Sequence, residues 1–172
     1  MKRRIKKAFS DRQIARRVRK LGAEIRADAG KGEVFLLGVL KGASCFLADL
    51  MRAIPGEVSY GYINVVRDIT DTEVATAMEL EYLLYSDIAD KNVYLLKDVV
   101  STGVIESYLL MQLRQKRPRN LKLVALVDRP ELRTVALDVD FRAFKAGHHG
   151  AFAGYGLELD GQWANLPYIG RM

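Results

Sequence analysis

NVYLLKDVVSTGV, residues 92–104, is the stretch that decides the fold. Its first five residues, Asn92 to Leu96, form a short apolar run of the kind that predicts a parallel strand covered on both faces. Small and hydroxylated residues follow, and then a helix with Ile105, Leu109 and Leu113 on one side. Ligands of open α/β sheets bind beyond the carboxyl ends of the strands. The segment from Lys97 to Val104 is therefore the first place to look for a site.

This segment has the composition of a phosphate cradle. Backbone N–H groups at a helix start, helped by the Ser101 and Thr102 hydroxyls, bind anions well. The alternative is a well-capped helix start without a ligand, and composition alone favours that alternative.

The rest of the chain alternates between strands and helices. A capping box at Ser10 predicts a helix start, because Gln13 stands three residues later. A polar stretch, Arg67 to Glu73, predicts a turn or mobile loop. Such alternation indicates an open, mainly parallel α/β sheet flanked by helices. The expected strands are 34–40, 58–66, 79–84, 92–96, 121–127 and 139–144, and a helix is expected over 43–54.

Composition indicates one globular domain. The chain has 172 residues, of which 49% are hydrophobic and 28% charged, and one cysteine, Cys45, cannot form an internal disulfide. No run of about eighteen uncharged apolar residues is present to span a bilayer. No secretory signal is readable after the basic start. We expect a cytoplasmic protein without a membrane partner, consisting of a basic arm, residues 1–9, and a single domain, residues 10–172.

The net charge of +6 is unevenly distributed. Residues 1–20 contain ten basic residues and one acid, Asp11, and so carry +9, which leaves −3 for the remainder. This segment is the feature that favours nucleic-acid binding.

Several motifs, in order, resemble hypoxanthine-guanine phosphoribosyltransferases, which belong to the type I phosphoribosyltransferases. Asp98 and Thr102-Gly103 resemble their phosphoribosyl-pyrophosphate motif. The other motifs are Gly38-Val39-Leu40-Lys41-Gly42-Ala43, Ala48-Asp49-Leu50, Asp128-Arg129-Pro130-Glu131, Gly154-Tyr155-Gly156-Leu157 and Asn165-Leu166-Pro167-Tyr168-Ile169-Gly170.

The resemblance implies the type I phosphoribosyltransferase fold with a small hood formed by the chain ends. It also implies transfer of a phosphoribosyl group from phosphoribosyl pyrophosphate to a 6-oxopurine with Mg²⁺, in nucleotide salvage, and a homo-oligomer. In that family the pyrophosphate-binding loop, here Lys41-Gly42, often contains a non-proline cis peptide. The implied site residues are Asp98 and Ser101 for catalysis, Lys41, Gly42, Ser101, Thr102, Gly103 and Val104 for phosphate and pyrophosphate, Lys97 and Asp98 for ribose, Arg129 and Phe152 for the base, and Glu158 for the metal.

Several positions depart from the family pattern, four of them in residues assigned to the ribose, the base or catalysis. Lys97 replaces an acid and cannot accept hydrogen bonds from the ribose diol. Ser101 replaces an aspartate, and a serine without a partner base is a poor proton acceptor. Arg129 replaces a lysine that reads the purine oxo group, and its planar fork requires another geometry. The stacking aromatic is displaced by one residue, so Phe152 either stacks on the base or belongs to the core.

Three functions follow as hypotheses. The first is a purine phosphoribosyltransferase with altered or reduced activity. The second is a non-catalytic sensor of a nucleotide or phosphoribosyl pyrophosphate, favoured by Lys97 and Ser101. The third is a nucleic-acid-binding regulator on the same fold, favoured by the basic N-terminal segment.

Overall fold

A computed structural model describes residues 5–67, 78–82, 87–147 and 150–172. Its larger sheet has the strand order β4-β3-β2-β5-β6-β7, with every neighbouring pair parallel except β3 and β4. A smaller sheet has the order β1-β9-β8. The elements are β1 Lys6–Phe9, α1 Asp11–Ala29, β2 Val34–Val39, α2 Ser44–Ala53, β3 Val58–Arg67, β4 Met78–Tyr82, β5 Asn92–Val100, α3 Val104–Gln115, β6 Asn120–Asp128, η1 Pro130–Leu132, β7 Phe141–Lys145, β8 Phe152–Ala153 and β9 Ile169–Arg171.

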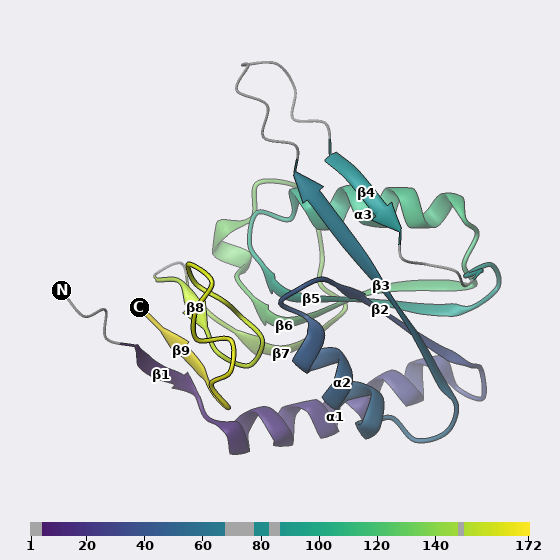
Figure 1. The fold of residues 1–172 in the computed structure, drawn as a ribbon. Helices are drawn as coiled ribbons and strands as arrows, with labels where there is room; N and C mark the ends of the chain where they lie inside the picture. Colours follow the sequence, from purple (N-terminus) through teal and green to yellow (C-terminus); the bar gives the residue numbers. More distant parts are fainter. Residues whose placement is uncertain (1–4, 68–77, 83–86, 148–149) are drawn as a thin grey trace.

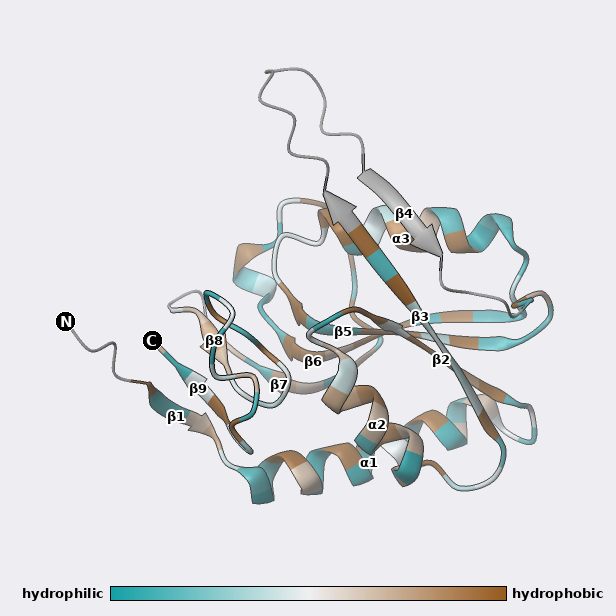
Figure 2. Ribbon diagram, viewed as in Figure 1, coloured by the Kyte–Doolittle hydropathy of each residue, from teal (hydrophilic) through white to brown (hydrophobic). Residues whose placement is uncertain are grey.

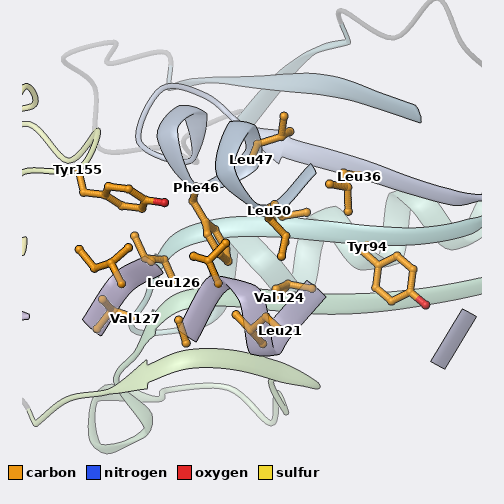
Figure 3. Packing of buried hydrophobic residues seen from close by; sticks show 14 of the residues in the cluster. Leu21, Leu36, Phe46, Leu47, Leu50, Tyr94, Val124, Leu126, Val127 and Tyr155 are labelled. Atoms are coloured by element: carbon orange, nitrogen blue, oxygen red, sulfur yellow. The ribbon is translucent and has the colours of Figure 1, made fainter. Parts of the chain in front are cut away.

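The larger sheet is covered on both faces, as the continuous apolar strands predict. Successive side chains of a strand point to opposite faces, and alternate residues of β2, β5 and β6 accordingly join two different clusters. Leu36, Tyr94 and Val124 pack with α1 and α2, whereas Leu37, Leu95 and Leu123 pack with α3. Figure 3 shows the first cluster gathered around residues of α2.

Helix α1 follows from its sequence pattern. The capping box predicted at Ser10 is present, with the Ser10 side chain accepting from Gln13 N and the Gln13 side chain accepting from Ser10 N. Hydrophobic and hydrophilic residues alternate along the helix (Figure 2), and the hydrophobic ones pack on the sheet. No helix among the described residues is long and apolar enough to cross a membrane.

The small sheet joins the two ends of the chain. β1 pairs with β9 antiparallel, with Lys6 opposite Arg171, and β9 pairs with β8. It lies beside the carboxyl ends of the central strands (Figure 1), in agreement with the predicted hood. The predicted boundary between an arm and a domain at residue 9 does not coincide with a structural break, because residues 6–9 form a strand of this sheet.

The strand predicted to end at Leu96 continues to Val100, because Lys97 and Val99 remain paired with Ala125 and Val127 of β6. The turn is therefore Ser101 to Gly103 rather than the whole segment from Lys97. Most of the predicted loop, residues 68–73, lies outside the described residues.

Candidate active site

The turn between β5 and α3 is open to solvent. Thr102 and Val104 are exposed, and the first backbone N–H groups of a helix have no partner within it. Gly103 adopts a left-handed conformation with φ of 84°. A methyl group there would lie 2.9 Å from the Arg133 and Leu137 side chains, so position 103 requires glycine on two grounds. The segment predicted to bind phosphate is therefore a turn that leads directly into the start of α3.

Lys97 and Asp98 form an ion pair at the end of β5. Their Nζ and Oδ1 atoms lie 2.5 Å apart, and the side chains are 18% and 17% exposed. The lysine that replaces the family's acid therefore pairs with the acid that remains. One oxygen of the predicted ribose-binding carboxylate is therefore already engaged by an ammonium group.

The loop after β2 lies against this pair. The Leu40–Lys41 peptide is cis, as the resemblance implies. A methyl group at Gly42 would lie 2.0 Å from Asp98 Oδ2 and 2.7 Å from its carboxyl carbon. The predicted pyrophosphate loop and the predicted ribose-binding acid are therefore in direct contact, although more than fifty residues separate them in sequence.

A second loop, from Gly154 to Glu158, closes over the first. Gly156 has φ of 91°, and a methyl group there would lie 3.0 Å from the carbonyl oxygen of Gly42. The Tyr155 hydroxyl donates to Asp49 Oδ2 of α2 over 2.6 Å, and burial, followed by the contact with Asp49, raises the pKa of Tyr155. Lys41 Nζ lies 3.9 Å from Glu158 Oε1. The predicted metal ligand therefore stands beside the predicted pyrophosphate loop.

The two residues predicted to bind the base lie together but away from solvent. Arg129 is 8% exposed and donates from Nε to Gly147 O and from Nη1 to Gly150 O, each over 3.1 Å. Its guanidinium carbon lies 5.5 Å from the centre of the Phe152 ring. Phe152 is buried in the core cluster, so the structure favours the core alternative for this side chain. Their roles toward a base stay predictions.

Sequence reasoning missed an arginine that supports the turn. Arg133 donates from Nη1 to Ser101 O over 2.6 Å and from Nη2 to Asp128 Oδ1 over 2.5 Å. Asp128 is 1% exposed and also pairs with Arg142 at 3.1 Å. Asp128 had been noted only as part of a motif, and no periodic pattern in the sequence marks its two partners.

Glu106, in the first turn of α3, was also missed. It is 4% exposed, and burial raises the pKa of its carboxyl group. Positive charge on Lys97 and Arg133 counteracts this effect, while Asp98 adds to it. The Lys97–Asp98 ion pair therefore lies near enough to the buried Glu106 carboxyl group to affect its pKa.

Comparison with known proteins shows the family of the chain. The family model of the phosphoribosyl transferase domain matches residues 7–158. The chain is 32% identical to the hypoxanthine-guanine phosphoribosyltransferase of Mycobacterium avium, covering 93% of this chain and 81% of that protein. It is 30% identical to the enzyme of the same name from Bacillus subtilis, covering 94% and 89%. The chain belongs to the hypoxanthine-guanine phosphoribosyltransferase family.

Structures of the family confirm the predicted fold. A crystal structure of a hypoxanthine-guanine phosphoribosyltransferase from Bacillus anthracis is 29% identical, with a TM-score of 0.90 over 98% of this chain and 99% of that one. The chain spans 25% of the length of the bifunctional protein TilS/HprT of Listeria innocua, to which it is 28% identical. The predicted family and its class of enzyme, a phosphoribosyltransferase, are thus confirmed.

Proposed function

We propose that this protein transfers the phosphoribosyl group of phosphoribosyl pyrophosphate to N9 of a 6-oxopurine such as hypoxanthine or guanine, releasing pyrophosphate. The observation that carries the proposal is the contact of Gly42 with Asp98 beside the open turn before α3. This contact brings a diphosphate loop, a ribose acid and a phosphate cradle to one edge of the sheet. Transfer requires these groups to be held in line.

Each group has a role that its chemistry suits. The N–H groups from Ser101 to Val104 and the Thr102 hydroxyl bind the 5′-phosphate, because helix starts favour anions. Lys41 and Gly42 bind the pyrophosphate, with the exposed Lys41 ammonium stabilising charge as it develops on the leaving group. Asp98 Oδ2 accepts from the ribose hydroxyls. Arg129 lies beside the base, and Ser101 contacts phosphate rather than serving as a base.

Glu158 suits a magnesium ion that arrives with its substrate. Mg²⁺ binds oxygen and is often held by one or two carboxylates together with substrate phosphates. The described residues contain no cluster of three metal-ligating side chains, but Glu158 provides one partly exposed carboxylate next to Lys41. In this role Mg²⁺ supplies charge neutralisation for the pyrophosphate.

The test is nucleotide formation from phosphoribosyl pyrophosphate and hypoxanthine, guanine or xanthine, with and without Mg²⁺. We expect a nucleotide product with at least one base, and its loss in Asp98→Asn. Absence of product with all three bases contradicts the proposal.

A non-catalytic sensor is the second candidate, and the Lys97–Asp98 ion pair favours it. The pair engages one acceptor for the ribose diol and puts an ammonium group at the position where the family has an acid. Calorimetric titration with phosphoribosyl pyrophosphate, inosine monophosphate and guanosine monophosphate distinguishes the candidates. Binding without turnover selects the sensor, and turnover selects the transferase.

A further inference from the structure

A basic cleft lies between the small sheet and the end of β7. We call it the cationic cleft, and its volume is about 350 Å³. Its walls carry Lys6 and Lys7 of β1, Lys145 of β7 and Arg171 of β9, and Phe9 and Phe152 also line it. None of the described residues that line it is acidic. Its lining comes from four strands, β1 near the start of the sequence and β7, β8 and β9 in its last third.

The charges of the cleft are available to a ligand. Lys6, Lys145 and Arg171 are exposed, and the fourth cation, Lys7, lies 4.6 Å above the ring of Tyr168. Four cations without an acid among them produce a positive potential that attracts phosphate groups.

The positive surface continues along α1. Arg12, Arg16, Arg19 and Lys20 are exposed, and their spacing places them on one side of the helix. Arg17 donates to the carbonyl oxygens of Ala143 and Arg142, which fixes α1 against β7, the strand that ends at the cleft. Lys20 is 3.8 Å from Glu24. Figure 2 shows hydrophilic residues on β1 and at the start of α1.

An aromatic pair accompanies the charges. The Phe9 and Phe144 rings are stacked, with centroids 4.1 Å apart and planes inclined by 16°. Both side chains are partly exposed. Aromatic rings between cations are the arrangement by which proteins bind single-stranded nucleic acids, because every base can stack on a ring.

We propose that the cationic cleft and the basic side of α1 bind single-stranded nucleic acid, with phosphates on the cations and a base against Phe9. Charge complementarity suits both a nucleic acid and an anionic membrane, and the structure of α1 favours the nucleic acid. Membrane-surface helices also need an apolar side, and that side of α1 is buried against the sheet. The exposed large hydrophobic residues in the described chain are Tyr60, Val104 and Met111, which line neither the cleft nor α1.

The proposal is independent of phosphoribosyl transfer. Lys6, Lys7, Lys145 and Arg171 are not among the residues assigned to transfer. Variants at these positions are therefore expected to keep the basal transferase activity or ligand binding of the wild type.

The experiment measures fluorescence anisotropy of a labelled 20-nucleotide oligouridylate between 50 and 300 mM KCl. The four cations of the cleft alone predict a slope near −3 for log K against log salt concentration, and phosphate contacts along α1 make this slope steeper. Lys6→Glu with Lys145→Glu should weaken binding about tenfold or more at 100 mM salt. The matched control is Lys31→Glu with Arg119→Glu, which changes net charge equally with exposed residues at the amino ends of the central strands.

The proposal is supported if the cleft variant loses affinity for the oligonucleotide while the affinity of the control variant changes by less than twofold. Both variants must keep the wild-type melting temperature. Absence of binding at 50 mM salt, salt-independent binding, or an equal loss in both variants would overturn it. Vesicles containing 30% phosphatidylglycerol serve as the second probe. Binding to these vesicles without binding to the oligonucleotide also overturns the proposal.

Discussion

Lys97 is the single residue that most alters the chemistry of the site. Asp98 is held by its ammonium group, so a variant that restores carboxylates should free it. We predict that Lys97→Glu with Ser101→Asp raises turnover by about 10²- to 10⁴-fold, the usual contribution of positioned acid–base groups. Steady-state rates with hypoxanthine and guanine measure this. Lys91→Glu, just before the other end of β5, is the control, and no gain in the double variant contradicts the assigned roles.

Position 42 requires glycine because the Asp98 side chain lies so close to it, and not because of its own torsion angles. Because a methyl group would lie 2.0 Å from Asp98 Oδ2, Gly42→Ala displaces the carboxylate or the loop. We expect affinity for phosphoribosyl pyrophosphate to fall by about tenfold or more, since overpacking of this kind costs about 1–3 kcal/mol. Calorimetry measures it. Gly147→Ala, whose added methyl lies 3.7 Å from its nearest neighbour, should bind as the wild type does, and equal affinity in both variants refutes the contact.

Glu106 should make stability depend on pH. Burial raises its pKa in the folded protein above the ordinary value of 4.5, so the folded state binds more protons than the unfolded state above that pH. Stability contributed by this group therefore falls as pH rises from about 4.5 through the folded pKa. Glu106→Gln should gain stability relative to the wild type between pH 4 and pH 8. Urea denaturation checks this, with exposed Glu57→Gln as control, and a pH-independent difference is the contrary result.

At the scale of elements, the sequence pattern predicts buried strands well and polar strands badly. The strand predicted over 58–66 is observed as Val58–Arg67, and four β-branched residues, Val58, Ile63, Val65 and Val66, favour it. β5 was predicted four residues too short, because charged side chains usually lie outside a sheet and here they neutralise each other. β1 was missed for the same reason, because its lysines conceal a strand that pairs across the hood.

The sequence indicated which loops form the site, but it did not indicate the side-chain contacts within the site. Lys41 and Asp98 follow predicted strands, which indicated one edge of the sheet, and Glu158 was implied only by the resemblance. The structure brings the three loops together. The engagement of Arg129 by two carbonyl oxygens and the support of Ser101 by Arg133 depend on side-chain geometry. No spacing rule in a single sequence encodes such contacts.

The segment 154–158 is anchored to α2 through Tyr155. Its hydroxyl is hydrogen-bonded to Asp49, which also pairs with Arg52. Tyr155→Phe should lower the free energy of unfolding by about 1.5 kcal/mol, the lower end for a hydrogen bond to a charged group. Chemical denaturation measures the change, and Tyr60→Phe, an exposed ring, provides the comparison. Equal stability of Tyr155→Phe and the wild type means that the bond contributes nothing.

At the scale of the whole molecule, one sheet separates two cores that share its strands. Phe46 of α2 belongs to one core and Leu109 of α3 to the other. Phe46→Ala should cost about 3–5 kcal/mol and Leu109→Ala about 2–5 kcal/mol, from lost burial and cavity formation. Both variants should unfold in a single transition by fluorescence and circular dichroism. Two separate transitions would show that the faces fold independently.

The pairing of β1 with β9 spans almost the full sequence, since Lys6 lies opposite Arg171. Each doubling of the intervening chain adds about 0.6 kcal/mol of closure entropy, whereas β5 and β6 close across a single short helix. The larger sheet should therefore form before the small one during folding, and the amides of β1 and β9 should exchange with solvent sooner than those of β5. The cationic cleft, built from both ends of the sequence, consequently exists only after the last step of folding.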